Sequence, residues 1–284
     1  MGSSGFTIII PAYNESDSIE KVVAEIKGLD GEYEIIVVDD GSVDGTYELA
    51  EKTGVKVLRH SCNKGYGASL KTGIKKAKYD QIVITDADGT YPIHEIPKLA
   101  GLMKKGFSMV VGARTGNDVA IPLFRRFPKW MLNKLANHLT GVKIPDINSG
   151  LRIMKKKDVL GFFNILPDGF SFTTTITLAM LTNDMQVQYV PINYYRRQGK
   201  SKIRPIYDTL NFIQLIIRTT LYFNPLKIFI PLSFLLVVIA LLVLVGSWFI
   251  FEKVMDTTFG IIIMTAVVVM SIGMLADLID KRMK

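Results

Sequence analysis

Short apolar runs alternate with amphipathic stretches along the first part of the chain. The runs at residues 6–10, 34–38, 55–60, 81–85 and 109–111 have the length and composition of buried strands. Residues 16–27, 45–53, 65–77 and 96–105 lie between them and read as helices. Further strands are expected at residues 151–154 and 186–195. Strands that alternate with helices predict an α/β fold whose mostly parallel sheet is covered on both faces.

The pattern changes toward the C-terminus. Residues 228–251 and 259–276 carry no charged side chain, and the first run spans about 36 Å as a helix, enough to cross a hydrocarbon core of about 30 Å. Their short link predicts a transmembrane hairpin rather than buried core helices. Apolar residues at helical spacing precede it and predict an interfacial amphipathic helix: Ile206, Leu210, Ile213, Ile217 and Leu221. We expect a soluble domain over residues 1–204, a juxtamembrane helix over 205–225, and two transmembrane helices with a short basic tail over 226–284.

The charge distribution predicts how the protein sits in a cell. The chain has a formal net charge of +8, and its basic residues flank the outer ends of the apolar pair. This placement favours anionic lipid over nucleic acid as a partner. The positive-inside rule predicts an integral membrane protein with its soluble domain and C-terminus in the cytoplasm. The single cysteine, Cys62, excludes an internal disulfide and agrees with a reducing compartment.

Two aspartates, Asp86 and Asp88, directly follow the strand expected at residues 81–85. Residues i and i+2 of an extended chain face the same way, so the two carboxylates converge if the extension persists into the turn. Such a pair suits Mg²⁺ or Mn²⁺, which takes one or two carboxylates together with phosphate oxygens. The alternative is that Asp-Ala-Asp-Gly is only a turn.

The surroundings of this pair favour the metal site. The loops at residues 11–15, 39–42 and 86–90 each follow a strand, so they open on the carboxyl edge of the sheet, where α/β proteins bind ligands. The first strand is not followed by Gly-x-Gly-x-x-Gly, and the chain has no Gly-x-x-x-x-Gly-Lys-[Ser/Thr] phosphate cradle. A bound nucleotide would therefore need a metal to neutralise its diphosphate.

Five motifs occur in a fixed order: Pro11-Ala12-Tyr13-Asn14-Glu15, Val38-Asp39-Asp40-Gly41-Ser42, Asn63-Lys64-Gly65, Asp86-Ala87-Asp88-Gly89 and Asp146-Ile147-Asn148-Ser149-Gly150. Together they resemble family 2 glycosyltransferases with the GT-A Rossmann-like fold. Within that family the chain is most similar to the polyprenyl-phosphate glycosyltransferases, which include dolichyl-phosphate mannose synthase. The resemblance implies a metal-dependent enzyme that transfers a sugar, with inversion, from a UDP- or GDP-sugar to dolichyl or undecaprenyl phosphate.

The resemblance also implies a donor site. The residues implied to bind the nucleotide sugar are Pro11, Ala12, Tyr13, Glu15, Asp40, Lys64, Asp86, Ala87 and Asp88. Asp86 and Asp88 would be the ligands of Mg²⁺ or Mn²⁺. Dolichyl-phosphate mannose synthases commonly continue this acidic motif with Leu-Gln-His, whereas this chain has Gly89-Thr90-Tyr91. The third metal ligand and the sugar therefore stay open.

On the acceptor side, arginines suit a lipid phosphate because guanidinium groups bind phosphate oxygens bidentately. The residues implied by the resemblance are Arg114, Arg125, Arg126, Arg197 and Lys202. For Arg125 and Arg126 a membrane-surface patch is an equal alternative. Asp146 is the catalytic candidate; because a phosphate acceptor is already ionised, an orienting or electrostatic role is predicted rather than general-base catalysis. The alternative for Asp146 is an Asx turn without chemistry.

Two other functions fit the sequence less well. Processive polysaccharide synthases of the same fold resemble one another in a Gln-x-x-Arg-Trp motif, which neither Trp130 nor Trp248 completes. A non-catalytic membrane tether for a nucleotide or glycan would not need the acidic pair together with Asp146 and Arg114. The sequence leaves a homo-oligomer open.

Overall fold

The computed structural model describes residues 5–116, 134, 136–137, 140–195, 217, 221, 224–251 and 256–283. The chain divides into two compact units, Met1–Ile213 and Gln214–Lys284. The first unit is built on a seven-stranded sheet, and the second contains two long helices, α9 (Leu226–Phe251) and α10 (Asp256–Met283).

The sheet has the strand order β3-β2-β1-β4-β6-β5-β7. Its strands are β1 (Phe6–Ala12), β2 (Tyr33–Asp39), β3 (Lys56–Arg59), β4 (Gln81–Ile84), β5 (Met109–Ala113), β6 (Arg152–Lys155) and β7 (Val187–Pro191). β1 pairs in parallel with β2 and β4, β2 with β3, and β5 with β7. β6 runs antiparallel to both of its neighbours, β4 and β5. The prediction of a mostly parallel sheet is confirmed, with β6 as the exception.

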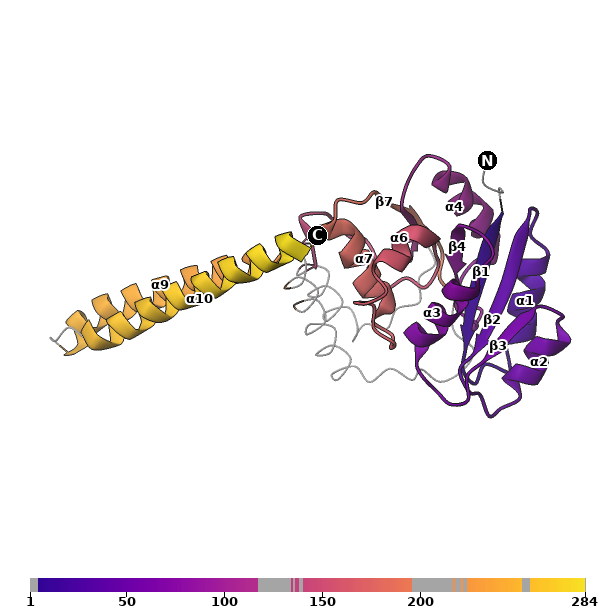
Figure 1. The fold of residues 1–284 in the computed structure, drawn as a ribbon, viewed down its shortest axis with the longest axis horizontal. Helices are drawn as coiled ribbons and strands as arrows, with labels where there is room; N and C mark the ends of the chain where they lie inside the picture. The colour runs from indigo at the N-terminus through magenta and orange to yellow at the C-terminus, as the bar shows by residue number, and fades with distance from the viewer. Residues whose placement is uncertain are drawn as a thin grey trace. The chain divides into compact units, whose positions relative to one another are not determined.

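Helices cover both faces of this sheet (Figure 1). They are α1 (Ile19–Lys27), α2 (Thr46–Lys52), α3 (Tyr66–Lys76), α4 (Ile96–Met103), α6 (Lys156–Gly161) and α7 (Phe172–Thr182), and the 3₁₀ turn η1 (Ile93–Glu95) precedes α4. α1 and α4 share a core with Ile8 and Ile10 of β1, whereas α3, α6 and α7 share another with Ile9. This division follows from the pleat, because successive side chains of a strand point to opposite faces.

Helix α7 is unusual because it is buried on every side. All residues from Phe172 to Leu181 are buried, and threonine occupies positions 173, 174, 175 and 177. A hydroxyl taken out of water needs a hydrogen-bond partner to offset its lost hydration. The Thr174 hydroxyl contacts Asn148, and the Thr177 hydroxyl contacts Arg152.

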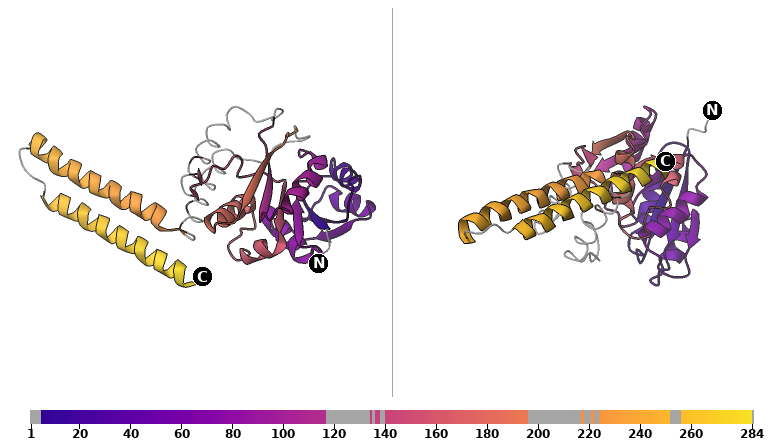
Figure 2. Two further views of the ribbon diagram at one scale, coloured as in Figure 1. Left: turned by 90° about the horizontal axis from the view of Figure 1, so that it is seen from above. Right: turned by 60° about the vertical axis from the view of Figure 1, so that its left-hand side comes forward.

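Helices α9 and α10 lie side by side in Figures 1 and 2. Their apolar stretches, Leu226–Phe249 and Asp256–Ile279, have mean hydropathies of 3.2 and 2.5. In the most apolar 18 residues of each helix, only 11% of the residues are buried. They are long and apolar enough to cross a membrane, and their exposure distinguishes them from core helices. A Cβ at Gly273 would lie 2.4 Å from Cβ of Phe229, so this glycine permits the close approach of the two helices. The expected pair of long apolar helices is confirmed; most of the juxtamembrane helix expected at 205–225 lies outside the described residues.

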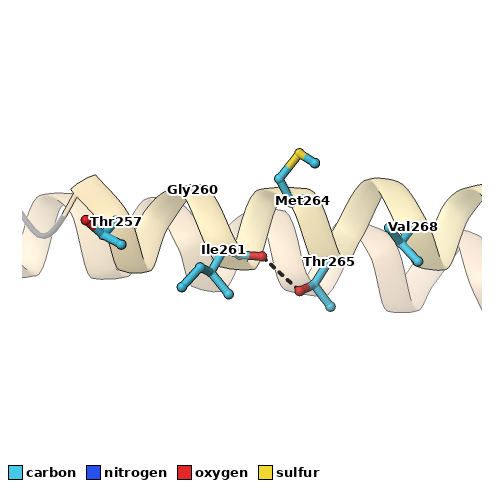
Figure 3. Close-up of a pocket in the computed structure, with 6 residues that line it drawn as sticks. All are labelled: Thr257, Gly260, Ile261, Met264, Thr265 and Val268. Carbon is cyan, nitrogen blue, oxygen red and sulfur yellow. Dashed lines mark hydrogen bonds between the residues drawn. The ribbon is translucent and has the colours of Figure 1, made fainter.

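One face of α10 carries a shallow pocket of about 500 Å³ (Figure 3). It is lined by Thr257, Gly260, Ile261, Met264, Thr265 and Val268. The Oγ1 hydroxyl of Thr265 donates to the backbone oxygen of Ile261 at 2.8 Å, so the helix itself satisfies this polar group. The pocket contains none of the candidate functional residues.

Candidate active site

The loop after β2 is organised around Asp40, which is 3% exposed. Its N–H donates to the oxygen of Ala12 at 2.8 Å, at the end of β1, where Pro11 and Ala12 are both buried. The Asp40 carboxylate accepts the backbone N–H groups of Lys64 at 2.9 Å and of Gly65 at 2.8 Å. Asp40, in the loop after β2, therefore joins the end of β1 to the segment that follows β3.

A histidine that the sequence analysis did not select completes this arrangement. Nδ1 of His60 lies 2.7 Å from Oδ1 of Asp40, and its Nε2 lies 2.9 Å from Oγ1 of Thr72. The ring is 8% exposed, so it fixes the Asp40 carboxylate from the protein interior. The sequence signal that could have identified His60 is its position, because it directly follows β3 at the same carboxyl edge of the sheet.

The loop after β1 is joined to the loop after β2 by Asn14. Its N–H donates to Oγ of Ser42 at 2.9 Å, and its Oδ1 accepts the N–H of Val43 at 3.0 Å. Asn14 has a φ of 53°, a left-handed conformation that asparagine tolerates better than most residues. The candidates Tyr13 and Glu15 flank Asn14 and are half-buried, so the predicted donor loops do meet at one edge of the sheet.

The acidic pair lies in a turn rather than in an extension of the strand. β4 ends at Ile84, residues 87–89 turn, and Gly89 has a φ of 69°. The extension on which the predicted convergence of Asp86 and Asp88 depended therefore does not persist into the turn. Oδ1 of Asp88 accepts the N–H of Thr90 at 3.1 Å and its hydroxyl at 2.6 Å. Thr90 is fully buried and serves to orient Asp88.

Asp86 lies against groups from two other parts of the chain, Tyr66 and Gly150. The Tyr66 hydroxyl donates to its Oδ1 at 2.9 Å, and burial together with the negative charge of Asp86 raises the pKa of Tyr66, so Tyr66 stays a donor. A Cβ at Gly150 would lie 2.7 Å from Oδ2 of Asp86, so only glycine fits there without a shift. The N–H of Gly150 donates to the Tyr91 hydroxyl at 2.6 Å. The side chain of Ala87, between the two aspartates, is 2% exposed and belongs to the core.

The chemistry of this donor set fits a hard divalent cation. Asp86 and Asp88 offer carboxylate oxygens, and both are half-buried. Within the part of the chain that the structure describes, His, Cys, Asp and Glu form no cluster of three or more that could hold a metal. Zn²⁺ sites usually need three or four protein ligands, whereas Mg²⁺ is bound by one or two carboxylates plus substrate phosphates and water. Asp86 and Asp88 therefore suit a cation that arrives with a diphosphate.

Arg114 and Asp146 form a bidentate pair. Nε of Arg114 donates to Oδ2 of Asp146 at 2.7 Å, and Nη2 donates to Oδ1 at 2.9 Å. The backbone N–H of Arg114 also donates to Oδ2 at 3.1 Å, and Asp146 is fully buried. Burial lowers the pKa of Arg114, but Tyr91 and Asp146 raise it by more, so the guanidinium stays charged. A carboxylate held by three N–H donors of one residue is poorly placed to remove a proton.

The sequence predicts Arg114 as a contact of the acceptor phosphate and Asp146 as the catalytic candidate with an orienting or electrostatic role, and the structure brings the two into direct contact. The Arg114 side chain is 18% exposed, and its guanidinium carbon lies 5.2 Å from the centre of the Tyr194 ring. Asp146 therefore holds Nε and Nη2 of a guanidinium whose side chain stays partly exposed. Four further acceptor candidates lie outside the described residues: Arg125, Arg126, Arg197 and Lys202.

The sheet order and the acidic loops at its carboxyl edge define a GT-A-like α/β domain. The chain belongs to glycosyltransferase family 2, because the model of that family, "Glycosyl transferase family 2", matches residues 7–161. The family predicted from the five motifs is confirmed.

Relatives and solved structures agree with this assignment. A dolichyl-phosphate hexose transferase of Haloferax volcanii is 30% identical over 70% of this chain and 86% of its own length. A dolichol-phosphate mannosyltransferase of Pyrococcus furiosus is 32% identical over 70% of this chain and 60% of its own. Glucosyl-3-phosphoglycerate synthase of Mycobacterium tuberculosis, crystallised with Mn²⁺, UDP and phosphoglyceric acid, superposes with a TM-score of 0.63 at 19% identity, covering 76% of this chain and 78% of that one. The last likeness establishes the fold.

Proposed function

We propose that this protein transfers a sugar, with inversion, from a UDP- or GDP-sugar to the phosphate of a membrane polyprenyl phosphate. The observation that carries the proposal is the loop of residues 146–150. At one end Asp146 holds Arg114, a group suited to an acceptor phosphate. At the other end Gly150 lies against Asp86, a group suited to a metal-bound diphosphate. One short loop thus joins the two halves that a transferase must bring together.

The family and the helical hairpin support the choice of a lipid acceptor. The relatives named above act, by their names, on dolichyl phosphate carriers, and another relative is named as an undecaprenyl-phosphate sugar transferase. The apolar helices α9 and α10 would anchor the enzyme in the membrane in which such lipids dissolve. The basic residues around the hairpin favour a cytoplasmic catalytic domain.

On the donor side, the loops joined by Asp40 would bind the nucleoside, with Tyr13, Glu15 and Lys64 at the same edge. Asp86 and Asp88 would hold Mg²⁺ or Mn²⁺. Such a cation, when bound, neutralises the diphosphate and so improves it as a leaving group. Tyr66 and Thr90 orient the two carboxylates for this task.

The transfer itself needs no proton removal. An ionised oxygen of the acceptor phosphate attacks the anomeric carbon on the face opposite the diphosphate, and the bond from that carbon to the diphosphate oxygen breaks. The nucleoside diphosphate leaves with the electron pair. The role proposed for Asp146 is therefore to orient Arg114 toward the acceptor phosphate. Arg125, Arg126, Arg197 and Lys202 are proposed as further phosphate contacts.

The proposal is tested with the purified full-length protein in detergent, Mn²⁺, a short-chain polyprenyl phosphate and a panel of UDP- and GDP-sugars. We expect one nucleoside diphosphate to be released, only when the lipid phosphate is present, with formation of a single lipid-linked sugar. A growing polymer would instead indicate a processive synthase. Binding of nucleotide without release from any sugar of the panel would indicate a non-catalytic tether.

A further inference from the structure

A fully buried arginine, Arg152, lies at the start of β6 and is not part of the donor or acceptor groups described above. Its side chain is 0% exposed. The backbone oxygen of Ser149 accepts from Nε of Arg152 at 3.0 Å and also from its Nη2. Nη1 donates to the Thr173 oxygen at 3.0 Å, to Thr177 Oγ1 at 2.9 Å and to the Met109 sulfur at 3.7 Å. All of these acceptors are neutral. Burial lowers the pKa of Arg152. A buried charge without a charged partner among its hydrogen-bond acceptors is costly to keep.

Arg152 fixes the middle of the loop of residues 146–150. Two of its N–H groups converge on the Ser149 carbonyl oxygen, while the Ser149 hydroxyl donates to the oxygen of Gly112. The next residue, Gly150, donates its N–H to Tyr91 and lies against the Asp86 carboxylate. The guanidinium of Arg152 therefore binds the peptide group that joins Ser149 to Gly150, and Gly150 is the residue that packs against the Asp86 carboxylate.

The threonines of α7 hold both Arg152 and the loop. The Thr177 hydroxyl and the Thr173 carbonyl accept from Arg152, and the Thr174 hydroxyl donates to Oδ1 of Asn148. The sequence analysis did not assign a function to this threonine run. In Figure 1, α7 lies on the same side of the sheet as α3 and α6.

We propose that Arg152 is a positioning residue that sets Asp86 for metal-dependent nucleotide binding by fixing the Ser149-Gly150 peptide. The inference rests on the proposed function, because it assigns to Asp86 the role of metal ligand. A lysine cannot replace Arg152, since a single ammonium lacks the planar fork that reaches Ser149 and α7 together. The same fork accounts for a fully buried arginine at the start of β6.

The test measures metal binding separately from transfer. For the full-length protein in detergent, the Mn²⁺ concentration that gives half of the maximal rise in Tm is determined with UDP and with GDP. We expect Arg152→Lys to raise this concentration at least fivefold. Two matched variants of α7 accompany it. Thr177 and Thr175 each donate to a backbone oxygen four residues earlier, but only Thr177 contacts Arg152. Thr177→Val is expected to raise the concentration about threefold, and Thr175→Val to leave it unchanged.

The outcomes separate the inference from the proposed function. If the wild-type protein shows no Mn²⁺-dependent rise in Tm with either nucleotide, the metal-dependent function fails and the inference fails with it. If the wild type responds and Arg152→Lys responds at the same Mn²⁺ concentration, Arg152 is only structural and the inference alone is overturned. Should Arg152→Lys fail to fold, equal Mn²⁺ responses of Thr177→Val and Thr175→Val overturn the inference, and a shift confined to Thr177→Val supports it.

Discussion

Replacement of Gly150 by alanine directly tests the junction between the metal carboxylate and the acceptor loop. The added Cβ would lie 2.7 Å from Oδ2 and 2.8 Å from Oδ1 of Asp86, whereas ordinary contacts begin at 3.4 Å. The carboxylate must therefore retreat by about 0.7 Å, the difference between 3.4 and 2.7 Å, to reach normal van der Waals contact. This exceeds the tolerance of about 0.2 Å on metal–ligand distances.

A displacement of this size predicts a large loss of activity. Misplacement by about 1 Å can cost about 100-fold in rate, so we expect kcat/KM of Gly150→Ala to fall about 10- to 100-fold, or about 1.4 to 2.7 kcal/mol. The Mn²⁺ concentration for half-maximal transfer should rise as well. Folding should be little affected, because φ of Gly150 lies outside the left-handed region in which alanine is strained.

The assay follows nucleoside diphosphate release against Mn²⁺ concentration, with Tm measured in parallel. Gly161→Ala is the matched control, since its Cβ would meet nothing within 4 Å and it lies at the end of α6, outside the site. A Gly150→Ala enzyme with wild-type kcat/KM and wild-type Mn²⁺ dependence would refute the placement of Asp86 in the metal site.

Three further substitutions probe separate parts of the site. Asp88→Ala should abolish transfer with little loss of Tm, because it removes a half-buried carboxylate proposed as a metal ligand rather than core packing. Asp146→Asn should lower kcat about 10- to 100-fold, since charge-assisted hydrogen bonds to Arg114 contribute about 1.5 to 3 kcal/mol; the pH profile of kcat should keep its shape. His60→Phe should raise KM for the nucleotide sugar about tenfold, because Asp40 loses a buried partner, with KM for the lipid unchanged.

Each of these predictions has its own control. Asp17→Ala changes an exposed aspartate and should leave transfer intact, so equal losses in Asp17→Ala and Asp88→Ala would argue against a metal role. Loss of a titration step from the pH profile of Asp146→Asn would show that Asp146 is a general base after all. His94 is exposed on η1; a rise in nucleotide-sugar KM as large in His94→Phe as in His60→Phe would contradict the role of His60.

Local sequence patterns were sufficient for the succession of strands and helices and for much of the donor edge. Strand and helix periods depend on neighbouring residues, so the alternation of elements and the apolar hairpin could be predicted. The rule that ligands bind at the carboxyl ends of parallel strands then placed Asp40 and Asp86 at one edge. The same rule could have selected His60, which directly follows β3. The spacing of His60, His94 and His138 along the chain does not suggest a metal site, so that second signal does not select His60.

The contacts that distinguish this site needed the tertiary structure. β6 enters the sheet antiparallel between β4 and β5, and no local period encodes that order. Its path brings Asp146 to Arg114, 32 residues away, and places Arg152 under the threonines of α7. These partners are chosen by packing between distant segments, whose energies depend on the assembled core. The sequence by itself determined which chemical groups reach the edge of the sheet, and the fold decided which of them hold one another.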